Sequence, residues 1–162
     1  MTALYRAFGG AAADGRFAIF NPQVNFDEAA LRSPTVFNFF EPGYVLPGIL
    51  ASAGLVAPEF QITTASTAVS VPNSLYAAVY TPASPSSSTI VLNLSSLTAN
   101  ASNPAAMVGT LNQLLCANAM SAQTQAAIES ALAAAPSGES PSALAQLSLY
   151  LACTSPDAAI QR

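Results

Sequence analysis

The chain contains no histidine, no lysine and no tryptophan. Without histidine it cannot form a Ser-His-Asp or Cys-His catalytic arrangement from its own residues, and it cannot bind a metal through imidazole. Without lysine, its four basic residues are all arginines, and eight carboxylates leave a net charge of −4. Because nucleic acids and anionic lipids are bound through clustered basic residues, we expect neither as a partner.

Charge and long apolar runs are also scarce. Only 7% of the residues are charged, although 52% are hydrophobic and the mean hydropathy is +0.43. Proline and glycine interrupt the longest apolar stretch, YVLPGILASAGLVAP at 44–58, which is shorter than the ~20 residues of a membrane-spanning helix. We therefore expect no transmembrane span. No Gly-rich phosphate loop, dinucleotide fingerprint or G-x-S-x-G motif is present.

The N-terminal segment, MTALYRAFGGAAADGRF, lacks the continuous apolar region of a signal peptide. Its ALYRAF stretch is typical of the last turns of a helix that stops at Gly9-Gly10, which suggests a chain beginning within something larger. Residues 1–25 are otherwise expected to be loop and extended arm. RFAIF at 16–20 and TIVLNL at 89–94 could pair as a short two-stranded β element.

Residues 26–80 are predicted to be an aromatic- and proline-rich half with short helices. Asn25 as N-cap and Glu28 three residues later predict a helix over about 26–32. Further helices are expected within 48–55 and after Pro58. A turn at residues 71–73 is expected to separate two short segments, and TPASPSSS at 81–88 to be a flexible loop.

The C-terminal part, 103–162, is predicted to be an antiparallel helical bundle. Asn103, Ser140 and Ser155 are each followed by proline, which is the pattern of an N-cap and a first helical residue. A further helix is expected from Ser121. Three apolar stripes have helical spacing: Met107, Leu111, Leu114 and Leu115; Thr124, Ile128, Ala131 and Leu132; Leu144, Leu147 and Leu151. The fold class is therefore mainly α, in a single domain over 1–162.

Three stretches of the chain resemble the bacterial family called domain of unknown function 1800. SPTVFNFFEPGYVLPGILASAGLVAPEFQI at 33–62 is similar to the family's signature, and LNQLLCANAMS at 111–121 with LYLACTSPDAAIQR at 149–162 is similar to its C-terminal pattern. The resemblance covers about 33–162. It implies the C-terminal portion of longer, mostly helical proteins that often carry an export signal, hence a periplasmic or extracellular setting. It implies no catalytic residues.

Two cysteines, Cys116 and Cys153, each lie near the end of a predicted helix. If these helices pack together, the cysteines could form a disulfide. In the chain-entropy model, closing the loop between them would stabilise the folded state by ~3–4 kcal/mol. The alternative is two small buried thiols.

Carboxylates are the only acid–base groups that the composition offers. Glu41 and Glu59 each lie beside a proline among aromatic and apolar residues, so they are the candidate catalytic pair. A carboxyl group that is removed from water has a raised pKa, as a general acid or base requires. Asp27 and Glu28 could bind calcium, although helix capping explains them more simply; no other cofactor is predicted. Asp157 is expected to be an acid at a helix start.

The segment SPTVFNFFEPGYVLPG at 33–48 is exceptionally rich in aromatic side chains and proline. The favoured interpretation is an irregular strap whose rings pack against the C-terminal helices. In the functional alternative, Phe37, Phe40 and Tyr44 bind a sugar ring or an acyl chain. Arg32 could bind a substrate carboxylate, but pairing with Glu28 at i,i+4 is favoured. In a third interpretation, the rings cover a face that belongs to a missing N-terminal region.

Two functions remain open at the level of sequence. The first is a structural or interaction module of a larger assembly, whose partner is the missing N-terminal region of a longer family member or a second copy. The second is a hydrolase for ester, lactone or glycosidic bonds that uses carboxylates or a bound calcium ion. The hydrolase predicts a pocket at Glu41 or Glu59, and the module predicts that both acids lie at the surface.

Overall fold

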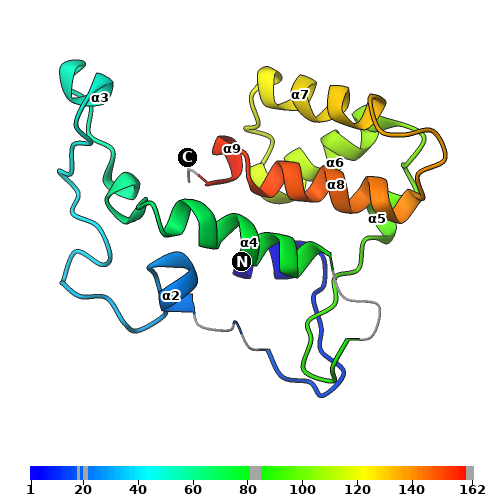
Figure 1. The fold of residues 1–162 in the computed structure, drawn as a ribbon, viewed down its shortest axis with the longest axis horizontal. Coiled ribbons are helices and arrows are strands. Elements are labelled where there is room, and N and C mark those ends of the chain that lie inside the picture. Colours follow the sequence, from blue (N-terminus) through cyan, green and yellow to red (C-terminus); the bar gives the residue numbers. More distant parts are fainter. Residues whose placement is uncertain (18, 20–21, 81–84, 160–162) are drawn as a thin grey trace. The chain divides into compact units, whose positions relative to one another are not determined.

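A computed structural model describes residues 1–17, 19, 22–80 and 85–159 of the chain. Its contacts divide the chain into two compact units. We call Met1–Ala18 together with Leu75–Arg162 the helical unit, and Ile19–Ser74 the middle unit. The boundary between them falls inside one helix, α4 (Figure 1). Each unit is described by itself.

Helices make up most of the ordered structure of the helical unit. Short loops join its three longest helices, as predicted for the C-terminal part. The elements, apart from α4, are α1 (Thr2–Ala7), α5 (Ser95–Thr98), α6 (Pro104–Cys116), α7 (Ala122–Ala133), α8 (Pro141–Cys153) and α9 (Pro156–Ala159). The predicted mainly α fold is confirmed. None of the described helices has the length and apolarity needed to cross a membrane.

Two of the Pro-preceding N-caps predicted from sequence, Asn103 and Ser140, form as expected. The Asn103 side chain accepts a hydrogen bond from the backbone N–H of Ala106 at 3.1 Å, and Ser140 accepts one from Ala143 at 3.1 Å. Proline follows each cap, at a position where the helix needs no N–H donor. At the other end of the chain, α1 stops at Gly9, whose φ of +54° is accessible to glycine at little cost.

The core of the helical unit surrounds α8. This helix packs against α5, α6, α7 and α9, so it is covered on several sides. Its buried positions have the spacing 0, 3, 4 and 7, and they are Ala145, Ser148, Leu149 and Ala152. The predicted stripe Leu144, Leu147 and Leu151 is only half-buried. Small residues bring the neighbouring helices close, and therefore α8 turns a different face inward than its leucines suggested.

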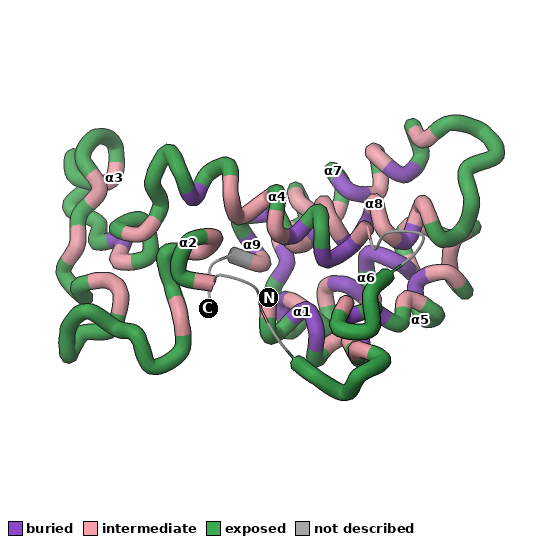
Figure 2. The backbone as a smooth tube through the Cα atoms, turned by 60° about the horizontal axis from the view of Figure 1, so that its bottom comes forward, coloured by how far each residue is buried: buried purple, intermediate pink, exposed green. Residues whose placement is uncertain are grey.

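The predicted apolar stripe of α6 is buried over only part of its length. Met107 and Leu111 are fully buried, together with Val108, whereas Leu114 is 42% exposed. Figure 2 shows buried positions of the helical unit along α1, α6, α7 and α8 and the C-terminal part of α4.

Three tyrosines join α4 (Thr67–Val79) to α8 within the helical unit. The rings of Tyr76 and Tyr80 stack at 4.4 Å, and the Tyr150 ring meets that of Tyr76 edge-on at 5.8 Å. Gln146 donates a hydrogen bond to the carbonyl of Val79 at 3.3 Å. Burial raises the pKa of Tyr80, and the two neighbouring hydroxyls raise it further.

Helix α4 corrects the prediction of a turn at residues 71–73. The helix continues through Pro72 because its start is strongly fixed. The Thr67 hydroxyl accepts a hydrogen bond from the Thr64 N–H at 2.7 Å, and the Thr64 hydroxyl accepts one from the Thr67 N–H at 3.1 Å, which is a reciprocal capping arrangement. The proline removes one donor near the beginning of the helix, and the turns on either side maintain its direction.

The middle unit contains short elements: α2 (Pro22–Phe26), α3 (Ile49–Ser52) and the 3₁₀ helix η1 (Pro58–Ile62), followed by the first residues of α4. The helix predicted over 26–32 is wrong. Pro22 starts α2 earlier, and Asp27 at φ +55° and Leu31 at φ +61° exclude a helix over those residues. The helices expected within 48–55 and after Pro58 form as α3 and η1.

Within the described residues there are isolated β-bridges but no strand. Val91 of the predicted TIVLNL strand forms an antiparallel bridge with Ala11, not with the RFAIF segment. The backbone N–H of Ala11 and that of Val91 donate to each other's carbonyl at 3.1 and 2.9 Å. Part of RFAIF, and half of the loop predicted at 81–88, lie outside the described residues.

Candidate functional site

The structure brings the segments of Glu41 and Glu59 together in the middle unit. The Glu41 backbone N–H donates to the side-chain oxygen of Gln61 at 2.7 Å, and the Ala57 N–H donates to the Tyr44 carbonyl at 2.8 Å. Residues 41–44 are thus attached to η1, whose first turn contains Glu59. Both carboxylates are exposed to solvent, so burial does not desolvate them.

The predicted substrate-binding residues are distributed over the same unit. Phe40 and Tyr44 are half-buried, and Arg32 is exposed. Phe37 is 57% exposed, because a tight turn presents it to solvent: its N–H donates to the Thr35 hydroxyl at 3.1 Å. The expected pairing of Arg32 with Glu28 at i,i+4 requires a helix, which residues 27–32 do not form.

Asp27 and Glu28, the predicted calcium ligands, are both exposed. Asp27 follows the end of α2 with φ +55°, a conformation that aspartate tolerates better than most residues. In the described parts of the chain, histidine, cysteine, aspartate and glutamate do not gather in groups of three or more that could hold a metal ion.

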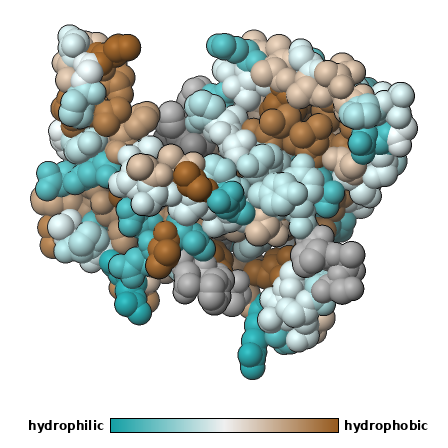
Figure 3. Space-filling model, in the orientation of Figure 1, coloured by the Kyte–Doolittle hydropathy of each residue, from teal (hydrophilic) through white to brown (hydrophobic). Residues whose placement is uncertain are grey.

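Apolar exposure is the main feature of the middle unit. Among its described residues, Ala57 is the one apolar residue that is buried. Its large apolar side chains that remain exposed are Val24, Leu31, Val36, Phe37, Val45, Ile49, Leu55, Val56, Phe60 and Val69. We call these ten side chains the apolar surface of the middle unit. Figure 3 shows hydrophobic atoms covering α3, which belongs to this unit. Val36 is 94% exposed. The packing of the aromatic segment against the C-terminal helices stays a prediction.

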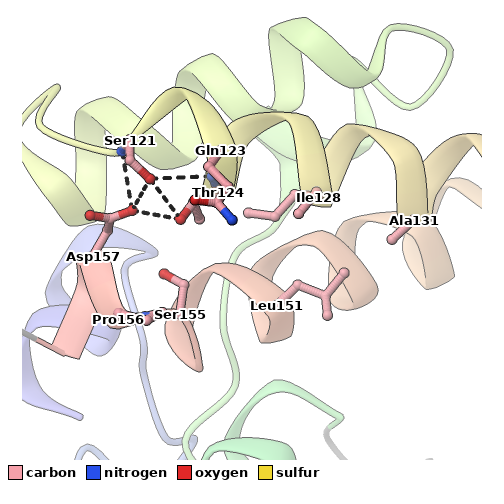
Figure 4. A pocket seen from close by; sticks show the side chains of 10 residues that line it. Ser121, Gln123, Thr124, Ile128, Ala131, Leu151, Ser155, Pro156 and Asp157 are labelled. Atoms are coloured by element: carbon pink, nitrogen blue, oxygen red, sulfur yellow. Dashed lines mark hydrogen bonds between the residues drawn. The ribbon is translucent and has the colours of Figure 1, made fainter. Parts of the chain in front are cut away.

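A groove in the helical unit has a polar network at one end. It has a volume of about 520 Å³ and lies between α7 and the corner where α8 passes into α9 (Figure 4). Thr124, Ile128 and Ala131 line it from α7, and Leu151 lines it from α8. Hydrophobic atoms gather between α7 and α8 in Figure 3.

Asp157 closes the polar end of this groove. One carboxylate oxygen, Oδ2, accepts three hydrogen bonds: from the Ser121 N–H at 3.1 Å, the Ser121 hydroxyl at 2.8 Å and the Thr124 hydroxyl at 2.6 Å. The Ser121 hydroxyl in turn accepts from the Thr124 N–H at 3.2 Å, as an N-cap does. A buried carboxylate thus binds the start of α7 to α9.

This network is an attachment point between helices. Asp157 was predicted only as an acid at the start of the last helix, and its position in the first turn of α9 is confirmed. Its contacts with Ser121 and Thr124 were not predicted. Both hydroxyls donate their protons to the carboxylate, so the serine has a hydrogen-bond acceptor but no imidazole to carry its proton away during an attack. The geometry supports stability rather than nucleophilic catalysis.

Both cysteines are thiols in the structure, Cys116 buried and Cys153 half-buried. Burial raises the pKa of the Cys153 thiol to about 12; the N-terminal amino group lowers it, and the nearby Cys116 sulfur raises it. The disulfide stays a prediction.

We expect Cys153 to react slowly with iodoacetamide at pH 8. A pKa of about 12 reduces the thiolate fraction roughly 1,000-fold against an ordinary cysteine, while the greater nucleophilicity of a basic thiolate restores roughly 20- to 30-fold. The net expectation is alkylation at least about 30-fold slower than in urea, measured by mass spectrometry. The folded state favours the protonated thiol, so stability should fall as pH rises from about 9 toward 12. Equal alkylation rates in the folded and unfolded chain would contradict this.

Comparison with known proteins assigns a family. The family model described as "Protein of unknown function (DUF1800)" matches residues 2–160 of the 162-residue chain. The comparison with curated proteins found no match, and the comparison with solved structures found none either.

Proposed function

The chain belongs to the DUF1800 family, and we propose that it is a non-catalytic structural and interaction module whose middle unit binds the surface of a partner. The apolar surface of the middle unit carries this proposal. A compact unit normally buries its large apolar side chains. Among the described residues of this unit, ten of them are exposed and one alanine is the buried apolar residue.

The size of this surface fits a protein interface. Fully burying a valine, leucine, isoleucine or phenylalanine side chain stabilises by ~1.5–3 kcal/mol at ~25 cal/mol per Å², which corresponds to ~60–120 Å² each. The ten side chains are 37–104% exposed, so together they offer on the order of 400–800 Å². A standard protein–protein interface buries ~800 Å² on each partner.

The backbone of the middle unit also supports a docking role. Its short elements are joined by turns with positive φ at Asp27, Leu31 and Asn38, so few of its hydrogen bonds belong to long helices. Such a segment gains most of its stability when a partner covers its apolar side chains. Two partners fit this description: the region that precedes this segment in a longer family member, and a second copy of the chain.

The hydrolase alternative has less support. It requires a pocket in which Glu41 or Glu59 faces the aromatic segment, but both acids are exposed, and the groove of the helical unit is lined by other residues. Calcium binding at Asp27 and Glu28 would need additional oxygen ligands, because this ion takes six to eight. The structural module requires neither a pocket at these acids nor a bound calcium ion.

The test is the affinity of the chain for the separately produced upstream region of a longer DUF1800 protein, measured by titration calorimetry. We expect the double substitution Val36→Ser and Phe37→Ser to weaken binding at least about 10-fold, because apolar side chains at an interface centre dominate affinity. The matched control is Val91→Ser with Leu114→Ser, which alters two exposed apolar residues of the helical unit. Equal losses in both variants, or no binding by the wild type, would contradict the proposal.

A further inference from the structure

Resting on the proposed function, we infer that the partner of the middle unit is an apolar protein surface surrounded by arginine or lysine, and not a second copy of this chain. The charges of the middle unit carry this inference. Its acidic residues are Asp27, Glu28, Glu41 and Glu59, and its one basic residue is Arg32. The net charge of the middle unit is therefore 1 − 4 = −3. All five side chains are exposed.

Three of these acids lie close in sequence to residues of the apolar surface. Glu59 directly precedes Phe60, and Glu28 lies three residues from Leu31. Glu41 lies four residues after Phe37, in the segment attached to η1 by the Gln61 hydrogen bond. A partner that covers the apolar side chains must therefore approach the carboxylates as well. Its own charges decide whether that approach is favourable.

A second copy provides the wrong charges. In a two-fold symmetric dimer the same patch meets itself, so a unit with a net charge of −3 would face another with a net charge of −3. The helical unit is no better as a partner: three arginines and four acids give 3 − 4 = −1. The chain has no lysine with which to compensate. Like charges at an interface cost affinity, and they act as negative selection against that pairing.

A basic partner satisfies both requirements. Burial of its apolar centre supplies affinity, while arginine or lysine around the rim pairs with the four carboxylates and accelerates association. Because the carboxylates are exposed, salt screens these pairs, and the charge preference must weaken as ionic strength rises. The acids thus have two effects: they attract a basic surface and keep copies of the chain apart.

Sedimentation velocity tests the second effect on the chain itself. We expect the wild type to stay monomeric at about 0.01 M salt and to associate at least about 10-fold more strongly at about 1 M, where the Debye length falls from ~30 to ~3 Å. The variant Glu28→Gln, Glu41→Gln, Glu59→Gln should associate at low salt. The matched control Asp14→Asn, Glu129→Gln, Glu139→Gln removes the same charge from the helical unit and should stay monomeric. A salt-independent wild-type dimer would overturn the inference.

Two synthetic amphipathic helical peptides test the first effect. They share one apolar face, and their polar faces consist of lysine or of glutamate. At low salt the lysine peptide should bind the wild type at least about 10-fold more tightly, and the triple glutamine variant should lose most of this preference. Equal binding of both peptides would overturn the charge inference but leave the apolar docking surface in place. Binding of neither peptide would overturn the docking surface itself, and the proposed function with it.

Discussion

Replacing Asp157 with alanine is expected to lower the free energy of unfolding by about 3 kcal/mol. The carboxylate accepts three hydrogen bonds from Ser121 and Thr124. A hydrogen bond to a charged group contributes ~1.5–3 kcal/mol to stability. Alanine leaves the Ser121 N–H and two hydroxyls without this acceptor in a partly buried place, where water replaces part of what the three bonds contribute. Urea unfolding followed by circular dichroism measures the effect.

Two controls separate this network from general charge effects. Asp157→Asn keeps one oxygen acceptor of similar shape, so it should cost less than alanine. Glu139→Ala removes an exposed acid in the loop before α8 and should change stability by no more than about 0.5 kcal/mol. If Asp157→Ala and Glu139→Ala behave alike, the carboxylate does not join α7 to α9.

Truncating a large apolar side chain is expected to lower the free energy of unfolding strongly in the helical unit and only slightly in the middle unit. Leu149→Ala should lower the free energy of unfolding by about 2–5 kcal/mol, because this side chain is fully buried in α8 and leaves a cavity. Ile49→Ala removes a side chain of similar size that is 87% exposed in α3. In the isolated chain it should change stability by no more than about 0.5 kcal/mol.

For partner binding, we expect the opposite ranking of these two variants. Ile49→Ala is expected to weaken the complex, whereas Leu149→Ala should affect binding only through the loss of folded chain. A loss of stability from Ile49→Ala comparable to that from Leu149→Ala would contradict the account. It would mean that the apolar residues of the middle unit form a core.

Local signals explain which parts of the fold could be predicted. A capping side chain followed by proline, as at Asn103-Pro104 and Ser140-Pro141, defines a helix start from neighbouring residues alone. The helices α6 and α8 were predicted for this reason, whereas α7 was predicted from Ser121 and the apolar spacing that follows it. Gly9 likewise ended α1 where expected, because its backbone conformation favours glycine.

Signals that compete with one another explain the errors. Asn25 and Glu28 have the spacing of a capping box, but Pro22 starts α2 three residues before Asn25. Pro72 indicated a break, but the reciprocal Thr64–Thr67 hydrogen bonds begin α4 firmly enough for the helix to continue. Both errors arose where two local rules disagreed and sequence alone could not weigh them.

The candidate sites depended on contacts between distant residues. No pattern connects Ser121 with Asp157, because 36 residues separate them, and only the packing of α7 against the α8–α9 corner brings them together. The aromatic segment at 33–48 posed the opposite problem. Its composition fits a core as well as a surface. Val36 and Phe37 lie on an exposed turn of the middle unit, and their packing against the C-terminal helices stays a prediction.

The central claim is that the middle unit presents its apolar side chains to solvent until a partner covers them. Carbene footprinting of the free, monomeric chain with residue-level mass spectrometry tests it most directly. The account predicts that Val36, Phe37 and Ile49 are labelled nearly as fast as in urea, while Leu111 and Leu149 are strongly protected. Protection of Val36, Phe37 and Ile49 in the free chain to the same degree as Leu111 would contradict it.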